Sequence, residues 1–162
     1  MSLMSESPEV LATIDRELKG KKLLVGRKIG QSKLDILGAS LRVEAKPHKY
    51  PTGEKVVAWE KRFFSKFVEG DFDSILLHRF LYKPVKDYIE DPEQVLSEVR
   101  RILPKGGVLV VNSYLLDDRT KGFRSAESFF TEQEMSELIK KQHFRRLSHL
   151  RVGDASLFVC EN

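Results

Sequence analysis

Short apolar runs and helically spaced apolar residues alternate along the chain. The apolar runs are too short for helices and predict strands at 21–26, 41–45, 55–60, 74–78 and 108–113. Between them, apolar residues at helical spacing predict helices at 7–20, 32–39, 91–104 and 131–144, and the segment 145–162 predicts an antiparallel hairpin. This alternation indicates one α/β domain. We expect a three-layer sandwich with a mostly parallel, Rossmann-like sheet of about seven strands and the hairpin at its edge.

Capping residues indicate where two of these helices begin. Asp91 precedes Pro92 and an apolar stripe, with Gln94 three residues after the cap, which predicts a capping box. Thr131 and Glu134 have the same spacing before the last helix. Both helices should therefore begin at these residues and place their apolar faces on the sheet.

Length and composition are those of a single globular domain. The chain has 162 residues, of which 41% are hydrophobic and 32% charged, and it contains no apolar run of the roughly 20 residues that span a bilayer. We expect no membrane span and no signal peptide. The single cysteine, Cys160, lies in an apolar run, so we expect a buried, inert thiol and a cytoplasmic protein.

The net charge of +4 permits a phosphate-bearing partner but does not require one. The basic residues form short, scattered groups, and solvated helix faces account for them more simply than a nucleic-acid groove does. A small-molecule substrate is the favoured partner. A protein partner or a second copy of the chain remains open.

The segment FDSILLHRFLYKPVKDYIEDPEQVLSEVRRILPKGGVLVVNS, at 72–113, resembles class I S-adenosylmethionine-dependent methyltransferases of the type 11 group. It is similar to their fourth strand, acid-Pro capped helix, Pro and Gly-Gly turn, and fifth strand. FFTEQEMSELIKKQHFRRLSHLRVG, at 129–153, is similar to the last helix and hairpin of the family. The resemblance implies S-adenosylmethionine as the cofactor, lying across the carboxyl ends of the first two strands.

The resemblance assigns a cofactor loop to the end of the first strand. Gly26 and Gly30 match the outer glycines of the family's Gly-x-Gly-x-Gly loop, where a Cβ would obstruct the approach of ligand atoms. Lys28 replaces the middle glycine, and Leu24 stands where the family usually has an acid. Lys28 can either contact the methionine carboxylate of the cofactor or fill the pocket itself.

Two glutamates complete the cofactor site that the resemblance implies. Glu44 ends the second strand, where the family places an acid that accepts hydrogen bonds from both ribose hydroxyls. Glu60 follows the third strand and matches an acid that contacts the adenine; Trp59 beside it is more typical of a core residue. An exposed strand-end carboxylate is the alternative interpretation of Glu44.

Two further residues are candidates for the chemistry. His78 ends the fourth strand, where substrate would meet the methyl group, and can act as a general base, with Tyr82 shaping the pocket. A structural histidine is the alternative. The remaining histidines have no metal-ligand spacing, so we expect no metal site.

The sequence thus predicts one domain in three parts: an N-terminal helix at 1–20, a cofactor-binding half at 21–70 and a sheet-completing half at 71–162. The polar segment 114–129 is long enough to form a lid. Three functions stay open at this point. The first is a methyltransferase, the second is an inactive relative that acts as a partner or regulatory module, and the third is a nucleotide-binding protein, which the absence of a dinucleotide-type Gly-x-x-Gly spacing disfavours.

Overall fold

The computed structural model describes residues 8–26, 41–44, 56–58, 63–83, 91–124, 126–152 and 154–162. For 41–44 and 56–58 it describes the backbone alone. The predicted helix at 32–39 lies outside the described residues, as do Lys28, Gly30, Trp59 and Glu60.

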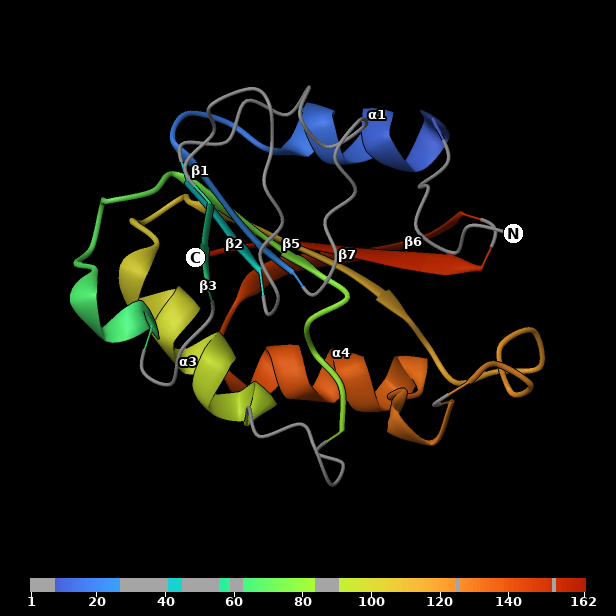
Figure 1. Ribbon diagram of the computed structural model, residues 1–162. Helices are drawn as coiled ribbons and strands as arrows, with labels where there is room; N and C mark the ends of the chain where they lie inside the picture. The colour runs from blue at the N-terminus through green and yellow to red at the C-terminus, as the bar shows by residue number, and fades with distance from the viewer. Residues whose placement is uncertain are drawn as a thin grey trace.

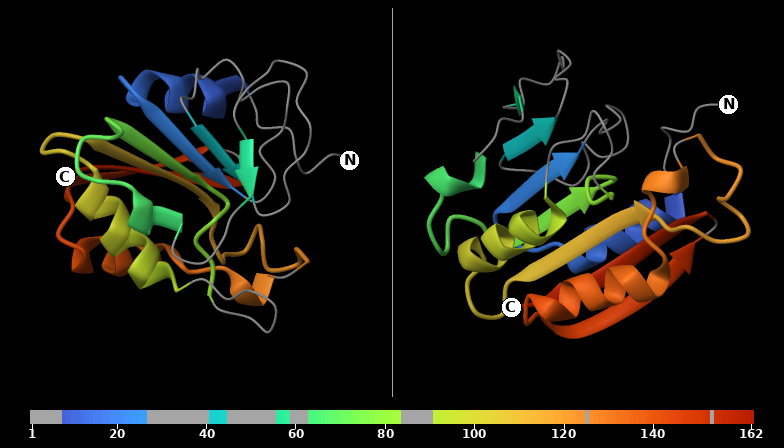
Figure 2. Two further views of the ribbon diagram at one scale, coloured as in Figure 1. Left: turned by 60° about the vertical axis from the view of Figure 1, so that its left-hand side comes forward. Right: turned by 90° about the horizontal axis from the view of Figure 1, so that it is seen from below.

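Seven strands form one sheet in the order β3-β2-β1-β4-β5-β7-β6. Their bounds are β1 Lys22–Gly26, β2 Leu41–Glu44, β3 Val56–Ala58, β4 Ser74–His78, β5 Val108–Tyr114, β6 Arg145–Val152 and β7 Ala155–Glu161. The strand order reverses between β1 and β4, which is where doubly wound proteins open a crevice at the carboxyl ends of their strands. The arrowheads of β2, β1, β4 and β5 point to this same edge in Figure 2.

The sheet is mixed, and four of its six strand pairings are parallel. Strands β3, β2, β1, β4 and β5 pair in parallel, over only three to five residues at each pairing. Strand β7 pairs antiparallel with β5 over seven residues and with β6 over six. These antiparallel pairings are longer than the parallel ones, so the antiparallel part forms nearly half of the ladder. The predicted α/β fold and C-terminal hairpin are confirmed.

Helix α1, Pro8–Glu17, covers one face of the sheet (Figure 1). The residues predicted to face inward are all buried: Val10, Leu11, Ile14 and Leu18. They pack with Leu24 of β1 and Leu76 of β4. Alternate residues of each strand point to opposite faces. The residues next to Leu24 and Leu76 in each strand therefore pack into the core on the other face of the sheet.

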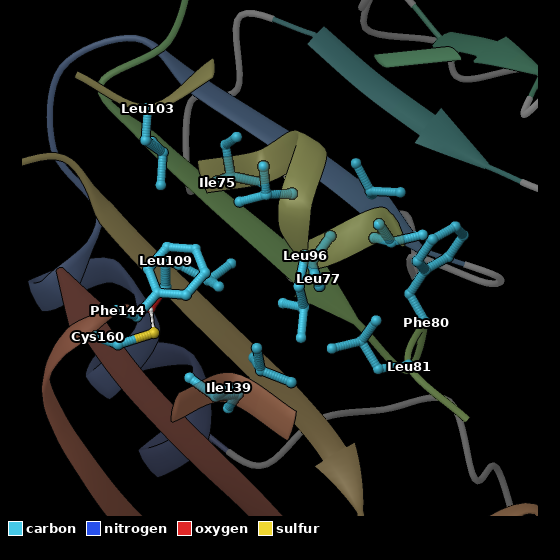
Figure 3. Close-up of a cluster of buried hydrophobic side chains, with 14 of the residues drawn as sticks. Ile75, Leu77, Phe80, Leu81, Leu96, Leu103, Leu109, Ile139, Phe144 and Cys160 are labelled. Atoms are coloured by element: carbon cyan, nitrogen blue, oxygen red, sulfur yellow. Dashed lines mark hydrogen bonds between the residues drawn. The ribbon is translucent and has the colours of Figure 1, made fainter. Parts of the chain in front are cut away.

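Helices α3, Pro92–Ile102, and α4, Glu132–Lys141, cover the opposite face and complete three layers (Figures 1 and 3). Asp91 caps α3 by accepting a hydrogen bond from the Glu93 N–H at 3.0 Å. The capping box of α4 is confirmed, because Thr131 and Glu134 each bond to the other's backbone N–H. The core on this face joins both helices to β1, β4, β5 and β7 through Leu23, Ile75, Leu96, Leu109, Ile139 and Phe158.

The connection from α1 to β1 is tied to the start of β4. The Ser74 hydroxyl donates to the Lys19 carbonyl at 2.7 Å and accepts from the Lys19 N–H at 3.1 Å, while Asp73 accepts from the Lys21 N–H at 2.8 Å. Gly20 makes the intervening turn with φ of 59°, which favours a residue without a Cβ. These bonds fix the register of β1 relative to β4.

Cys160 is fully buried in β7, as predicted, and its thiol contacts the Leu109 carbonyl at 3.6 Å (Figure 3). Burial raises the pKa of this thiol to about 12. Within the described ranges, no helix has the length and apolar character needed to cross a membrane.

Candidate functional site

Three strand-end residues and Asn112 of β5 form one row across the carboxyl edge of the sheet. Gly26 of β1 is in register with Glu44 of β2 on one side and with His78 of β4 on the other. His78 is in turn in register with Asn112 of β5. The parallel arrangement therefore brings Gly26, Glu44 and His78, which lie far apart in the sequence, to the switch point of the sheet.

The cofactor-binding candidates are only partly within the described structure. Gly26 is the buried last residue of β1, and the backbone of Glu44 lies directly beside it. Lys28, Gly30 and Glu60 lie outside the described residues, as does the side chain of Glu44. Their roles remain predictions.

Leu24 has a packing role in β1. Its side chain is fully buried between the sheet and α1, whereas Leu23 and Val25 face the layer of α3 and α4. Helix α1 covers this position with apolar side chains, and an ionised carboxylate buried there would lose its hydration without a compensating partner. The chain therefore keeps the strand while replacing the acid that the family usually has there.

His78 is buried, with an exposed fraction of 1%, and lies against Asn112. Asn112 Nδ2 is 2.9 Å from His78 Nδ1, so a neutral His78 accepts this hydrogen bond and carries its proton on Nε2. Burial, and secondarily the positive charge of Arg79, lower the pKa of His78 from 6.5 to about 3. His78 is therefore a neutral imidazole at physiological pH and a weak proton acceptor.

Arg79 follows His78 in the left-handed region of backbone conformation, with φ of 50°. A residue with a Cβ is strained there by about 1 kcal/mol or more, and such strain is concentrated at functional sites. The Arg79 N–H donates to the Asn112 carbonyl at 2.7 Å, which holds the turn. Its guanidinium carbon lies 4.7 Å from the centre of the Tyr114 ring, a cation–π geometry at the end of β5.

Tyr82 belongs to an aromatic cluster beside this edge. Its ring centre lies 5.6 Å from that of Phe129, which is 5.8 Å from Tyr114 and 6.5 Å from Phe123. Tyr82 and Phe129 are almost fully buried. The predicted pocket-shaping residue is thus a packing residue of a wall next to His78 and Arg79, and its role toward a substrate remains a prediction.

The segment 114–129 is packed onto the domain. Phe123, Ala126 and Phe129 join the aromatic cluster, and the turn η3, Ala126–Ser128, accepts a backbone hydrogen bond from Lys83 at 2.8 Å. Asp117 binds Arg151 of β6, and this hydrogen bond is the main reason that the pKa of Asp117 lies below its usual value. The segment therefore forms a wall fixed at several points along its length.

Comparison with solved structures places this arrangement among known folds. The chain is 19% identical to an S-adenosylmethionine-dependent methyltransferase of Thermotoga maritima, a possible histamine N-methyltransferase, with a TM-score of 0.66 over 93% of this chain and 86% of the other. It is 17% identical to the 1,6-didemethyltoxoflavin N1-methyltransferase of Burkholderia thailandensis, with a TM-score of 0.65 over 96% and 77%. The latter structure holds its substrate and S-adenosylhomocysteine. No family model and no curated protein sequence matches the chain.

The chain has the fold of class I S-adenosylmethionine-dependent methyltransferases. A third structure with this fold, from Sulfolobus solfataricus and assigned to the type 11 methyltransferases, is 15% identical, with a TM-score of 0.66 over 98% of this chain and 93% of the other. At such identities the likeness concerns the fold, and the site has to be argued from this chain's own residues.

In this methyltransferase fold, sequence reasoning missed Arg79, Asn112 and Tyr114. Asn112 and Tyr114 come at the end of the apolar run of β5, where a polar or aromatic residue at the carboxyl end of a parallel strand is a signal for a site. Arg79 had no sequence signal, because its backbone conformation and its contact with Tyr114 arise only when β4 and β5 are paired. Within the described ranges, no three His, Cys, Asp or Glu residues are grouped closely enough to hold a metal ion.

Proposed function

We propose that this protein is an S-adenosylmethionine-dependent methyltransferase that acts on a small-molecule acceptor. The observation that carries the proposal is the row of Glu44, Gly26 and His78 across the switch point of a methyltransferase fold. Doubly wound proteins bind nucleotide-like cofactors at this place, because the strand order diverges there and leaves space above the carboxyl ends. The cofactor proposal does not require a metal ion.

In the proposed site, each cofactor contact has a chemical reason. The backbone at Gly26 and Gly30 would let the ligand approach closely, and Glu44 would accept hydrogen bonds from the two ribose hydroxyls. Lys28 would pair with the methionine carboxylate, and Glu60 would contact the adenine. Bound S-adenosylmethionine supplies an activated methyl group to an acceptor held in line with it.

The acceptor would lie between His78 and the aromatic wall that contains Tyr82. The low pKa of His78 restricts its proposed chemistry, because a base whose conjugate acid has a pKa of about 3 removes protons poorly at neutral pH. The site therefore suits an acceptor that needs no strong base, such as a neutral amine. The Burkholderia enzyme, which methylates a small heterocyclic molecule, supports a small-molecule acceptor by likeness of fold.

Two departures from the family pattern favour a second function. Leu24 is buried in the core where the family usually has an acid, and Lys28 replaces the middle glycine. A methyltransferase fold that has lost its cofactor and serves as a partner or regulatory module would tolerate both changes.

Binding of S-adenosylmethionine and of S-adenosylhomocysteine distinguishes the two functions. A ligand that binds only the native state at a hundredfold excess over Kd stabilises the protein by about 2.7 kcal/mol, which a thermal shift detects. We expect such a shift for the wild type and a loss of it for Glu44→Gln. The exposed α4 residue Glu137, changed to Gln, is the control of equal charge change and should retain the shift.

Absence of a shift and of calorimetric heat at millimolar ligand would overturn the cofactor proposal. If Lys28→Gly then restored binding, the lysine would be shown to occupy the cofactor position, which is the inactive alternative. A wild type that binds both ligands and also transfers the methyl group to candidate amines would establish the enzyme.

A further inference from the structure

A cavity lies at the opposite edge of the sheet from the proposed cofactor site. It is a cavity of about 480 Å³ lined by Glu69, Arg100, Arg101, Lys105, His143, Arg145 and Asn162. These residues surround the amino ends of β4, β5 and β6 and the carboxyl end of β7, which the register brings together. Val108 of β5 is at this edge and Asn112 is at the other, so the rise of about 3.3 Å per residue separates the two sites by about 13 Å.

The cavity carries a positive charge that the described part of the chain does not neutralise. The doublet Arg100-Arg101 ends α3 and the doublet Arg145-Arg146 begins β6. In each doublet one arginine is paired, Arg101 with Glu98 at 2.7 Å and Arg146 with Glu161 at 3.6 Å.

The remaining cations of the cavity wall have no such pairing. Across the described ranges, Arg100, Lys105 and Arg145 form no ion pair, and all three are exposed. Among the described residues, Glu69 is the one acidic side chain that lines the cavity. The result is a hollow with an excess of cationic donors.

The walls that carry these cations are held by hydrogen bonds to backbone carbonyls. Asn162 donates from its side chain to the carbonyls of Arg100 and Leu103, at 3.0 and 2.6 Å, and its carbonyl accepts from the Gly106 N–H at 2.8 Å. The Gly70 N–H donates to the Ile102 carbonyl at 3.0 Å. The segments at Gly70 and Asn162 are therefore fixed to the end of α3, and Gly106 is fixed to Asn162, so the backbone that carries the cations is held in place before any ligand arrives.

The helix dipole accounts for only part of this charge. Cations in the last turn of α3 favourably face its partial negative charge, which explains Arg100 and Arg101. Arg145 comes from β6, far along the sequence, so the dipole of α3 does not explain its place in the cavity wall. The fold gathers basic groups that are scattered in the sequence.

We propose that this cavity binds the phosphate groups of a small phosphorylated ligand. Guanidinium groups such as those of Arg100 and Arg145 match phosphate oxygens through paired N–H donors, and Lys105 adds a compact charge. The volume lies within the range of small-molecule sites. The site is separate from the carboxyl edge, so it stands whether or not the protein binds S-adenosylmethionine.

Calorimetric titration with sodium tripolyphosphate at constant ionic strength tests this proposal. We expect saturable binding to the full chain, weakened about tenfold by Lys105→Gln and by Arg145→Gln, since each removes a charge-assisted contact. Lys140→Gln is the matched control. Lys140 is also exposed and forms no ion pair within the described ranges, but it does not line the cavity, so its variant should bind as the wild type does.

Three outcomes would overturn the proposal. Equal weakening by Lys140→Gln would show diffuse attraction to net charge instead of a site. Equal binding of sulfate would show a general anion effect. Binding of a single-stranded RNA oligonucleotide with no binding of tripolyphosphate would replace the small ligand with a nucleic acid. Unchanged melting temperatures of the variants, measured alongside, exclude misfolding as the cause of any loss.

Discussion

The Asn112 amide lies 2.9 Å from Nδ1 of His78, and both side chains are almost completely excluded from solvent at the carboxyl ends of adjacent strands. The contact joins β4 to β5 at the point where the proposed acceptor would approach. A neutral imidazole can accept this bond at Nδ1, and burial keeps His78 in the neutral form by lowering its pKa to about 3.

The first prediction concerns pH. His78 has a pKa of about 3 in the folded protein and about 6.5 when unfolded, so between these values the unfolded state binds more protons. The free energy of unfolding contributed by His78 is therefore fully present above pH 6.5 and is lost as the pH falls toward 3. Urea unfolding at several pH values should reveal uptake of close to one proton by this residue near pH 5.

The variant His78→Gln isolates that contribution, since its amide oxygen can still accept from Asn112 but does not titrate. Its unfolding free energy should depend less steeply on pH than that of the wild type. An NMR titration in which His78 protonates with a midpoint near 6.5 would contradict the prediction.

The second prediction concerns the Asn112 side chain itself. Asn112→Ala removes the donor to a buried ring nitrogen, and we expect a loss of about 2 kcal/mol in the free energy of unfolding. Ser113→Ala is the control, because within the described ranges the Ser113 hydroxyl makes only a long bond of 3.3 Å to the neighbouring carbonyl. Chemical denaturation that gave the two variants equal stability would refute a structural role for the Asn112–His78 contact.

The third prediction concerns the turn before β1. At Gly20, φ is 59° and an added Cβ would overlap the Asp73 carboxylate, which accepts from the Lys21 N–H. Gly20→Ala should therefore cost about 2–3 kcal/mol from backbone strain and the displaced Asp73.

Two other glycines serve as controls in the same denaturation experiment. Gly70→Ala, at φ of 90° with open space around it, should cost only the backbone part, and Gly122→Ala should change stability by less than about 0.5 kcal/mol. Equal losses at Gly20 and Gly70 would show that Asp73 moves away without cost.

The fourth prediction concerns Cys160. A fully buried thiol with a pKa near 12 forms almost no thiolate at pH 8, so it should not react with a disulfide reagent such as Ellman's in the native protein. It should react promptly in urea. Rapid labelling without denaturant would indicate that β7 opens locally or that the thiol is accessible.

Much of the fold follows from local sequence signals. The apolar spacing of α1, the Asp91 cap of α3 and the capping box at Thr131 each depend on residues within a few positions of one another, and the structure has them as predicted. Leu24 was likewise identified from sequence as a departure from the family pattern. Its effect became clear only through α1, which buries it. Gly26, Glu44 and His78 were chosen because each ends a predicted strand, and parallel pairing places them in one row.

By itself, then, the sequence determined helices α1, α3 and α4, the strands, and the positions of Gly26, Glu44 and His78 at strand ends, because caps and apolar periodicity act over one or two turns of chain. Only the tertiary structure decided that His78 is a buried neutral imidazole, that Arg79 lies on Tyr114, and that arginines from α3 and β6 line one cavity. Those properties depend on solvent exclusion and on charges brought close by strand pairing. Neither the burial nor the closeness of these charges exists until residues far apart in the chain are packed together.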